Sequence, residues 1–389
     1  MIIGIDIAKR NHEATAIDDA GQILGRITFA NSNAGAAKLL DFIARLKSED
    51  EKVVFGMEAT GHYWLAIYSY LVERDFDVCV INPIQSDSLR NLFIRKTKND
   101  QRDSFIIAEI IRFGRYTETQ LSDENTLALR QLCRYRTSLV DQTTELKLQA
   151  IAVLDQIFPE YETLFANIFG VSSKALLMEY TTPDDMLSVS AEKLAEVIDK
   201  TSRGRFKLEK AKEIQEKARN SFGITIAIDA FAFQLRQLIE QIKFIEEHIK
   251  EIEDHIKTYF DTLDSCLPTI PGIGMITAAI IESEIGDINR FAGPEKLVAF
   301  VGIDPSVKQS GDFIGSQNRM SKRGSPHLRR AIWQAAVRAV QVDPVLKAFF
   351  EKKRSEGKAY GTAIGAVARK LTYIIFVIMR DKKTYVPMA

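Results

Sequence analysis

Residues 1–30, MIIGIDIAKRNHEATAIDDAGQILGRITFA, begin the chain with three short runs rich in apolar and β-branched residues. The runs cover 1–8, 12–19 and 23–30, and turn-forming residues separate them near Lys9–Asn11 and Asp18–Gly21. Short apolar runs bounded by such residues are typical of strands. The opening of the chain therefore predicts three strands in a meander.

The segments that follow alternate between helical and strand patterns up to about residue 115. Helical spacing is present at 36–46, 63–74 and about 99–113, and strand-like runs are present at 52–59 and at 76–82, where Pro83 ends the run. Three meandering strands followed by helix, strand, helix, strand and helix is the element order of a ribonuclease H-like fold. We therefore predict an α/β domain at 1–115.

The middle of the chain, 116–264, predicts helices and a coiled coil. A long helix is expected at 121–158, ended by Pro159, and short helices at 160–225. From residue 231 the spacing between apolar residues alternates between four and three up to residue 256, as in a coiled-coil seam. The apolar positions are 231, 235, 238, 242, 245, 249, 252, 256 and 260. At 1.5 Å per residue the seam would span roughly 45 Å. The seam fits either an intramolecular hairpin with 121–158 or a dimer arm, and its pattern does not decide between these two arrangements.

A further domain is expected at 265–389, because the pattern changes after Pro268. IPGIGMITAAII, 270–281, has the form of a helix-hairpin-helix turn, in which Gly272 and Gly274 permit a tight turn and the following helix offers N–H groups to a phosphate. A simple turn between two helices is the alternative. Farther on, Ser325 and Pro326 suit the first positions of a helix that carries Arg329 and Arg330.

Composition predicts a cytoplasmic protein without a structural zinc site. The chain is 46% hydrophobic and 27% charged, three cysteines show no metal or disulfide spacing, and no signal peptide is recognisable. The apolar run 371–379 is far shorter than the ~20 residues of a membrane helix. Net charge is zero, but 88–99 and 319–338 carry cations and no acid. Such patches bind phosphate locally, since salt screens charges beyond about 10 Å.

Four acids form the candidate metal site. Asp100 and Asp103 share one side of the helix at 99–113, where on their own they suit a helix cap. Asp6, however, interrupts an isoleucine-rich strand, and Glu58 ends another apolar strand. In a ribonuclease H-like sheet these strands are neighbours, and the helix crosses their ends. Four carboxylates there need compensation by hard cations, such as two Mg²⁺ about 4 Å apart.

The cations beside these acids complete a nucleic-acid site. We expect the backbone phosphates of the nucleic acid to be held by Arg95, Lys96, Lys98 and Arg102. Several serines lie among the cations of 302–339. A serine is a poor nucleophile unless a neighbour takes its proton or stabilises the leaving charge, so on chemistry alone a turn or a cap fits each of these serines better than a nucleophile does.

Taken together, the four acids, the coiled-coil middle, PGIG and the later order SG, SKRG and LRR resemble the DEDD transposases of the bacterial insertion-sequence one-ten family, also described as bridge-RNA-guided recombinases. The resemblance covers nearly the whole chain. It implies a RuvC-like domain that binds Mg²⁺ through the four acids, and a C-terminal transposase domain whose serine becomes covalently linked to DNA. A structured RNA of the element would pair with donor and target DNA.

Carried over to this sequence, the resemblance makes Asp6, Glu58, Asp100 and Asp103 metal ligands and Ser310, in KQSGDF, the nucleophile. Ser321, in MSKRG, is the second choice. Nucleic-acid contacts are expected from Gly272, Gly274, Lys322, Arg323, Arg329 and Arg330. The family often has a basic or asparagine-type residue where this chain has Ser325. The resemblance also implies a composite site in a homo-oligomer, a dimer or tetramer joined through the coiled coil.

Three other functions remain to be compared with this one. A junction resolvase or ribonuclease H-type nuclease would use the same acids, but it does not need the serine-bearing domain. A non-catalytic scaffold for nucleic acid explains the coiled coil but not an acid within a strand. A sugar-kinase-like or actin-like ATPase needs a Gly/Thr-rich phosphate turn after the first strand, where this chain has AKRNHEA.

Overall fold

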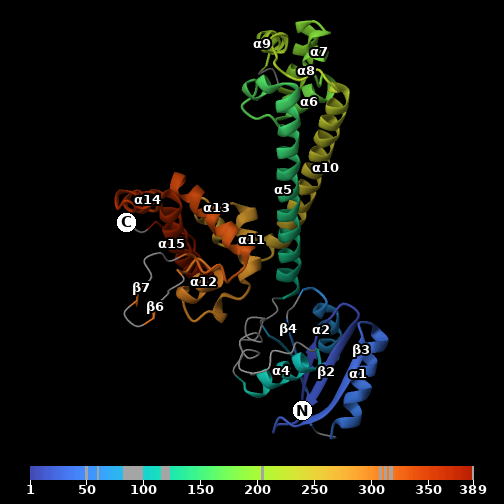
Figure 1. Ribbon diagram of the computed structural model, residues 1–389. Helices are drawn as coiled ribbons and strands as arrows, with labels where there is room; N and C mark the ends of the chain where they lie inside the picture. The colour runs from blue at the N-terminus through green and yellow to red at the C-terminus, as the bar shows by residue number, and fades with distance from the viewer. Residues whose placement is uncertain are drawn as a thin grey trace. The chain divides into compact units, whose positions relative to one another are not determined.

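The computed structural model describes residues 1–48, 51–58, 61–81, 100–114, 123–202, 206–305, 309–310, 313–314 and 319–387. The chain divides into two compact units, Met1–Leu121 and Ser122–Ala389 (Figure 1). Each unit is described by itself below. The division into three domains at 115 and 264 stays a prediction.

The first unit is built on a five-stranded mixed sheet. Its strands are β1 (Ile2–Asp6), β2 (Asn11–Ile17), β3 (Ile23–Ala30), β4 (Val54–Glu58) and β5 (Asp77–Ile81), in the order β3-β2-β1-β4-β5. The first three pair antiparallel, as the meander predicts, and β4 joins β1 and β5 in parallel. The unit is mixed α/β and consistent with a ribonuclease H-like domain.

Helices cover both faces of this sheet. A Cβ atom at Gly25 of β3 would touch α1 (Asn33–Leu46), whereas one at Gly4 of β1 would touch α4 (Asp100–Arg112). The main core lies under α1 and α2 (Trp64–Val72), and a smaller cluster that includes Ile107 and Ile110 lies under α4. Helix α1 begins at a Ser32 cap that accepts the Gly35 N–H at 3.1 Å.

The second unit contains two long helices, α5 (Glu124–Ile157) and α10 (Ile228–Asp261), that pack side by side (Figure 1). Ion pairs join Arg136 to Glu253 at 2.7 Å and Lys147 to Glu246 at 2.8 Å, so the helices run antiparallel. Predicted seam residues of α10, among them Leu235, Leu238, Ile242 and Ile256, are buried. The two helices therefore pair within one chain; coiled-coil geometry and an intermolecular arm stay predictions.

Two hydrophobic cores lie toward opposite ends of this helix pair. One joins the end of α5 and the start of α10 to η1 (Pro159–Thr163), α6 (Val171–Glu179), α7 (Pro183–Leu187), α8 (Ala191–Ser202) and α9 (Leu208–Arg219). The other joins the start of α5 and the end of α10 to the C-terminal helices. These are η2 (Leu267–Thr269), α11 (Met275–Ile285), η3 (Ile288–Arg290), α12 (Pro294–Val301), α13 (Pro326–Val342), α14 (Pro344–Ser355) and α15 (Tyr360–Asp381).

Helix α15 is central to the C-terminal core. Within the described ranges it is the one helix long and apolar enough to cross a membrane, and half of its apolar window is buried inside the protein. Ile364, Leu371 and Ile375 are fully buried, and α15 packs against α12, α13 and α14. The apolar run at 371–379 thus belongs to a longer helix than the run itself indicates, and that helix supports the core.

Candidate functional site

Asp6 and Glu58 are the last residues of two neighbouring parallel strands, β1 and β4. The final pair in the register between these strands is Ile5 with Met57, so each acid directly follows that pair. Adjacent strands lie about 4.8 Å apart. The backbone therefore brings the two predicted ligands to one edge of the sheet.

Two glycines show that both acids belong to the face covered by α4. A Cβ atom at Gly4 would lie 2.0 Å from the backbone of α4, and one at Gly56 would lie 1.9 Å from an isoleucine of that helix. Alternate residues of a strand share a face. Asp6 and Glu58 follow these glycines by two positions, so they lie on the α4 side.

The direction of α4 places its first turn at the same edge. The hydroxyls of Thr15 and Ser104 share a hydrogen bond of 2.7 Å beneath the helix. A Cβ atom at Gly21, in the turn after β2, would meet side chains from the last turn of α4. Since β2 runs antiparallel to β1, that turn lies beside the start of β1. The first turn of α4, with Asp103, therefore lies toward the end of β1 that carries Asp6.

Burial distinguishes these acids from ordinary surface carboxylates. Glu58 is 6% exposed and Asp103 is 5% exposed. A buried carboxylate is costly unless partners or a cation stabilise its charge. Asp6, Glu58 and Asp103 each make interactions within the protein. Their oxygens are the donors that a hard divalent cation prefers.

The structure does not bring all four predicted ligands together as a finished metal site. Among the residues it describes, no three His, Cys, Asp or Glu side chains form a group that could hold a metal ion. Asp100 begins α4, but its side chain lies outside the described part. The convergence of the four acids stays a prediction that the shared edge and face support.

Of the cations predicted beside the acids, Arg102 alone lies in the described part of the chain. It is half-buried in the first turn of α4 and makes interactions within the protein. Arg95, Lys96 and Lys98 lie outside the described residues. Their expected role in holding phosphate stays a prediction.

The two candidate nucleophiles lie in the second unit. Ser310 belongs to β6 (Gln309–Ser310), which pairs with β7 (Phe313–Ile314) through Ser310 and Phe313; the Ser310 side chain is not described. Ser321 donates its backbone N–H to the Asp304 carbonyl at 2.9 Å and its hydroxyl to the Asp304 carboxylate. Asp304 was not predicted from the sequence, where it is simply the acid before Pro305.

The four cations predicted to contact nucleic acid near the start of α13 fall into two pairs. Lys322 and Arg323 are exposed. Arg329 instead donates to the carbonyls of Val301 and Gly324 at 3.2 and 3.4 Å. Arg330 forms an ion pair at 2.7 Å with Asp141 of α5. Arg329 and Arg330 therefore also hold the domain together, while the first pair faces solvent.

An ion pair with a buried carboxylate anchors the helix that follows this loop. Ser325 caps α13, as predicted, by accepting the Leu328 N–H at 3.2 Å, and its hydroxyl donates to Glu284 at 2.8 Å. Arg134 of α5 donates to both Glu284 oxygens at 2.6 and 2.9 Å. Burial opposes ionisation of Glu284, but Arg134 and Ser325 outweigh it and lower the pKa of that carboxyl.

The predicted helix-hairpin-helix glycines have different environments. Gly272 has φ +97°, and a Cβ there would lie 2.6 Å from the Ala339 backbone nitrogen of α13. Gly274 precedes α11, and a Cβ there would meet nothing within 4 Å. The element before this turn is the three-residue η2. The open approach to α11 suits a ligand, and the motif itself stays a prediction.

Comparison with known proteins matches two regions of the chain. Residues 3–159 match a family model named DEDD_Tnp_IS110 and described as "Transposase", and residues 264–351 match "Transposase IS116/IS110/IS902 family". Together the two models cover more than half of the chain. The chain belongs to the IS110 transposase family.

Full-length relatives agree with this assignment. An insertion element IS116 protein of 44.8 kDa from Streptomyces clavuligerus is 24% identical over 99% of this chain and 96% of its own length. An insertion element IS110 protein of 43.6 kDa from Streptomyces coelicolor is 22% identical over 99% and 95%. A pilin gene-inverting protein from Moraxella bovis is 23% identical over 98% and 97%.

Membership of the IS110 family implies a DNA substrate, because transposases act on DNA. The four acids lie within the first matched region, and Ser310, Ser321 and the cations of the loop lie within the second. A DEDD transposase is expected to use a divalent metal ion. The acids at the edge of the first sheet have the donor chemistry for it.

Proposed function

We propose that this IS110-family transposase breaks and rejoins DNA with Mg²⁺ held by Asp6, Glu58, Asp100 and Asp103 and with Ser310 as the nucleophile. One observation carries the proposal. The ends of β1 and β4 and the first turn of α4 bring three of these acids to one edge and one face of a single sheet. Bound Mg²⁺ would polarise the scissile phosphate.

Ser310 would carry out the phosphoryl transfer as the attacking group. The Ser310 oxygen forms a bond to phosphorus, the bond from phosphorus to the 3′-oxygen breaks, and the serine proton is lost as the 3′-oxygen gains one. Because one phosphodiester replaces another, the reverse attack by a 3′-hydroxyl of the partner duplex rejoins the strands without an external energy source. Exposed Lys322 and Arg323 would hold DNA phosphates beside the serine.

The contacts of Ser321 favour Ser310 as the nucleophile. Both the backbone N–H and the hydroxyl of Ser321 are committed to Asp304, which suits a residue that fixes the loop before α13. The same carboxylate would also suit a proton acceptor for Ser321, so the two serines must be separated by experiment.

The remaining parts of the proposal concern partners and place of action. An RNA encoded by the element would select donor and target DNA by base pairing, as in other RNA-guided enzymes. A dimer or tetramer would form through the arm made by α5 and α10. The segment at the α6–α9 end of this arm exposes Phe222 (92%) and Ile226 (83%), which supports an interface there. The enzyme would act on DNA in the bacterial cytoplasm.

The test uses the full-length protein with its element RNA, Mg²⁺ and DNA carrying the element ends. We expect the unmodified chain and Ser321→Ala to form a covalent protein–DNA adduct that denaturing gels resolve, and Ser310→Ala to form none. Adduct with Ser310→Ala but not with Ser321→Ala would reverse the assignment. Free DNA ends without any adduct would instead indicate a nuclease or junction resolvase.

A further inference from the structure

Charge is distributed unevenly along the chain, and its C-terminal part is strongly basic. Residues 344–389 contain ten Lys and Arg and three Asp and Glu, a net charge of +7 in a chain whose total is zero. The rest of the chain therefore carries −7. This basic part comprises α14, the turn after it, α15 and the residues that follow, and it lies outside the cation-rich stretches at 88–99 and 319–338.

The end of α14 gathers four of these cations in one turn. Gly357 has φ +79°, and the Lys358 N–H donates to the Lys353 carbonyl at 3.2 Å. This hydrogen bond belongs to a Schellman cap, in which glycine permits the left-handed conformation. Arg354 also donates to the Lys358 carbonyl at 2.6 Å. Lys358 therefore returns to the last turn of α14, which carries Lys352, Lys353 and Arg354.

Helix α15 adds two cations to the same surface. It packs against α14, and Figure 1 shows the two helices side by side. The ammonium groups of Lys353 in α14 and Lys370 in α15 lie 5.6 and 4.9 Å from the centre of the Phe349 ring. Because like charges repel, their approach to one ring is unfavourable unless anions offset it. Arg369, next to Lys370, is exposed.

Carboxylates neutralise this surface only in part. Glu356 pairs with Lys353 at 2.8 Å, and Lys353, with the nearby charges of Lys352 and Lys358, holds the pKa of the Glu356 carboxyl below its usual value. One carboxylate thus lies among three cations. Glu351, the other acid of α14, is exposed. Within the described ranges, no ion pair is formed by Lys352, Lys358, Arg369 or Lys370.

The basic surface is connected to the loop that contains the candidate nucleophile. A β-bridge between Pro305 and Met320 closes that loop, which includes Ser310, at its base. A Cβ atom at Gly365 of α15 would lie 3.4 Å from the end of the Met320 side chain. Arg369 follows Gly365 by four positions, so it lies on the same side of α15, one turn away. DNA on this surface would therefore lie near the base of the loop.

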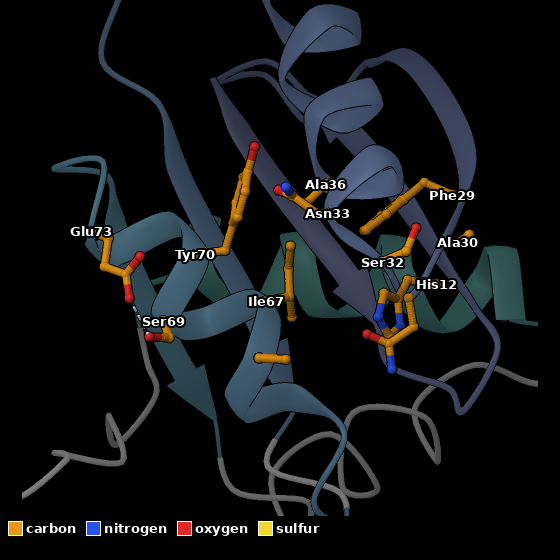
Figure 2. Close-up of a pocket in the computed structure, with 12 residues that line it drawn as sticks. His12, Phe29, Ala30, Ser32, Asn33, Ala36, Ile67, Ser69, Tyr70 and Glu73 are labelled. Carbon is orange, nitrogen blue, oxygen red and sulfur yellow. Dashed lines mark hydrogen bonds between the residues drawn. The ribbon is translucent and has the colours of Figure 1, made fainter.

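A cavity in the first unit has a different chemistry. It has a volume of about 440 Å³ and lies between α1 and α2 (Figure 2). Among the described residues that line it there is no lysine or arginine, and its one carboxylate, Glu73, accepts the Ser69 hydroxyl at 2.9 Å. A phosphate there would meet a carboxylate and no cation. The basic surface of the second unit suits a polyanion better.

We propose that the basic surface on α14 and α15 binds the phosphate backbone of duplex DNA. This α14–α15 patch consists of Lys352, Lys353, Arg354, Lys358, Arg369 and Lys370. From the start of α15 to Lys370 it measures about 15 Å at 1.5 Å per residue, a length over which one DNA strand passes about four phosphates. Such contacts position DNA and do not select its sequence. The inference rests on the proposed function, because it takes DNA as the substrate, but it involves none of the four acids and neither serine.

The experiment removes three exposed charges of the patch and leaves the core unchanged. One full-length variant combines Lys352→Gln, Lys358→Gln and Arg369→Gln. A second variant keeps the charges and changes the side chains, with Lys352→Arg, Lys358→Arg and Arg369→Lys. The matched control loses the same net charge from exposed lysines of α8 and α9, through Lys193→Gln, Lys200→Gln and Lys212→Gln.

Binding to a short labelled DNA duplex is measured by fluorescence anisotropy in EDTA at several salt concentrations, with an RNA duplex of equal length as the second probe. We expect the unmodified chain, the charge-retaining variant and the control to bind the DNA alike. The glutamine variant of the patch should bind it about tenfold or more weakly. Its plot of log affinity against log salt concentration should be less steep by about three, one for each lost cation.

Three results would overturn the proposal. The first is equal affinity and equal salt dependence in the glutamine variant of the patch and in the control, or no binding of duplex DNA by the unmodified chain. The second is the same loss in the charge-retaining variant, since packing rather than charge would then explain it. The third is a loss confined to the RNA duplex, which would contradict the assignment to DNA.

Adduct formation with Mg²⁺ separates this proposal from the proposed function. If the unmodified chain forms no adduct while its binding of duplex DNA still depends on the patch, the proposed function is wrong and the patch still binds DNA. If adducts form normally and the glutamine variant of the patch binds duplex DNA as tightly as the control, the patch proposal alone is wrong.

Discussion

At the scale of single residues, the fold perturbs the titration of His12, which is almost fully buried in β2. Burial lowers the pKa of its imidazole, and the neighbouring Asn31 side chain opposes that shift only partly. We therefore expect a pKa below the ordinary 6.5. An NMR titration of the imidazole signals measures it, with His12→Gln to assign the resonance. A pKa at or above 6.5 would contradict the buried neutral ring.

The same shift has a consequence for stability with a definite sign. The unfolded chain binds a proton at His12 more readily than the folded chain does, so acid favours the unfolded state. The contribution of His12 is fully favourable above about pH 6.5 and is lost as the pH falls through the lowered value. The protection factors of the β2 amides, which correct for the pH dependence of intrinsic exchange, should therefore fall more steeply with acid in the unmodified chain than in His12→Gln.

Gly4 is the residue on which the approach of α4 to the sheet depends. A Cβ there would lie 2.0 Å from the Ser104 carbonyl oxygen, which belongs to backbone and cannot yield easily. We expect Gly4→Ala to cost about 3 kcal/mol of local stability, the upper end of overpacking effects. Gly361→Ala, where nothing lies within 4 Å of a Cβ, is the control. Unchanged hydrogen exchange in β1 and α4 of Gly4→Ala would contradict this packing.

At the scale of elements, the ion pair of Glu284 with Arg134 should contribute more to stability than the ion pair of Arg330 with Asp141. Glu284 is almost fully buried and binds Arg134 and Ser325, whereas Asp141 and Arg330 meet at the surface. We expect Glu284→Gln to cost about 1–3 kcal/mol, since it removes the charge that the Arg134 guanidinium and the Ser325 hydroxyl bind. Asp141→Asn should cost less than about 1 kcal/mol. Hydrogen exchange in α11 and α13 compares the two, and equal losses would argue against the network.

Elements that local pattern determines were predicted well from the sequence. The three-strand meander follows from β-branched runs and turn residues, and the α13 cap follows from Ser325 and Pro326. Glu58 ends β4, as predicted, whereas Asp6 was expected inside the first strand and is the last residue of β1. Contacts between segments that lie far apart in the sequence leave no periodic pattern in it. Arg134 meets Glu284 across 150 positions, and Ser321 meets Asp304 through a loop without regular structure.

His12 illustrates the same limit. It sits in a strand with an ordinary alternating pattern, and its burial depends on how neighbouring elements cover that strand. The apolar run at 371–379 is shorter than α15, because the earlier turns of that helix contain small residues such as Ala363 and Ala368. The positions of small residues in a core are set by neighbours that sequence alone does not identify.

At the scale of the whole molecule, the proposed oligomer depends on the arm of α5 and α10. Phe222 and Ile226 are exposed at 92% and 83% near its α6–α9 end. We expect the double substitution to aspartate at these two positions to lower the molar mass measured by light scattering. Val386→Asp, at an apolar residue that is 72% exposed, is the control and should leave the mass unchanged. An unchanged mass in the double variant would place the interface elsewhere.

The central claim is that the acids at the ends of β1, β4 and the start of α4 bind a divalent cation together. Its most direct measurement is Mn²⁺ binding to the full-length protein by electron paramagnetic resonance, with Mg²⁺ as competitor. We predict binding by the unmodified chain that Mg²⁺ displaces, and weakening by about tenfold or more in each of Asp6→Asn, Glu58→Gln and Asp103→Asn. Glu73→Gln, an acid on the opposite side of the sheet, should bind normally. Equal Mn²⁺ affinity in all five proteins would contradict the account.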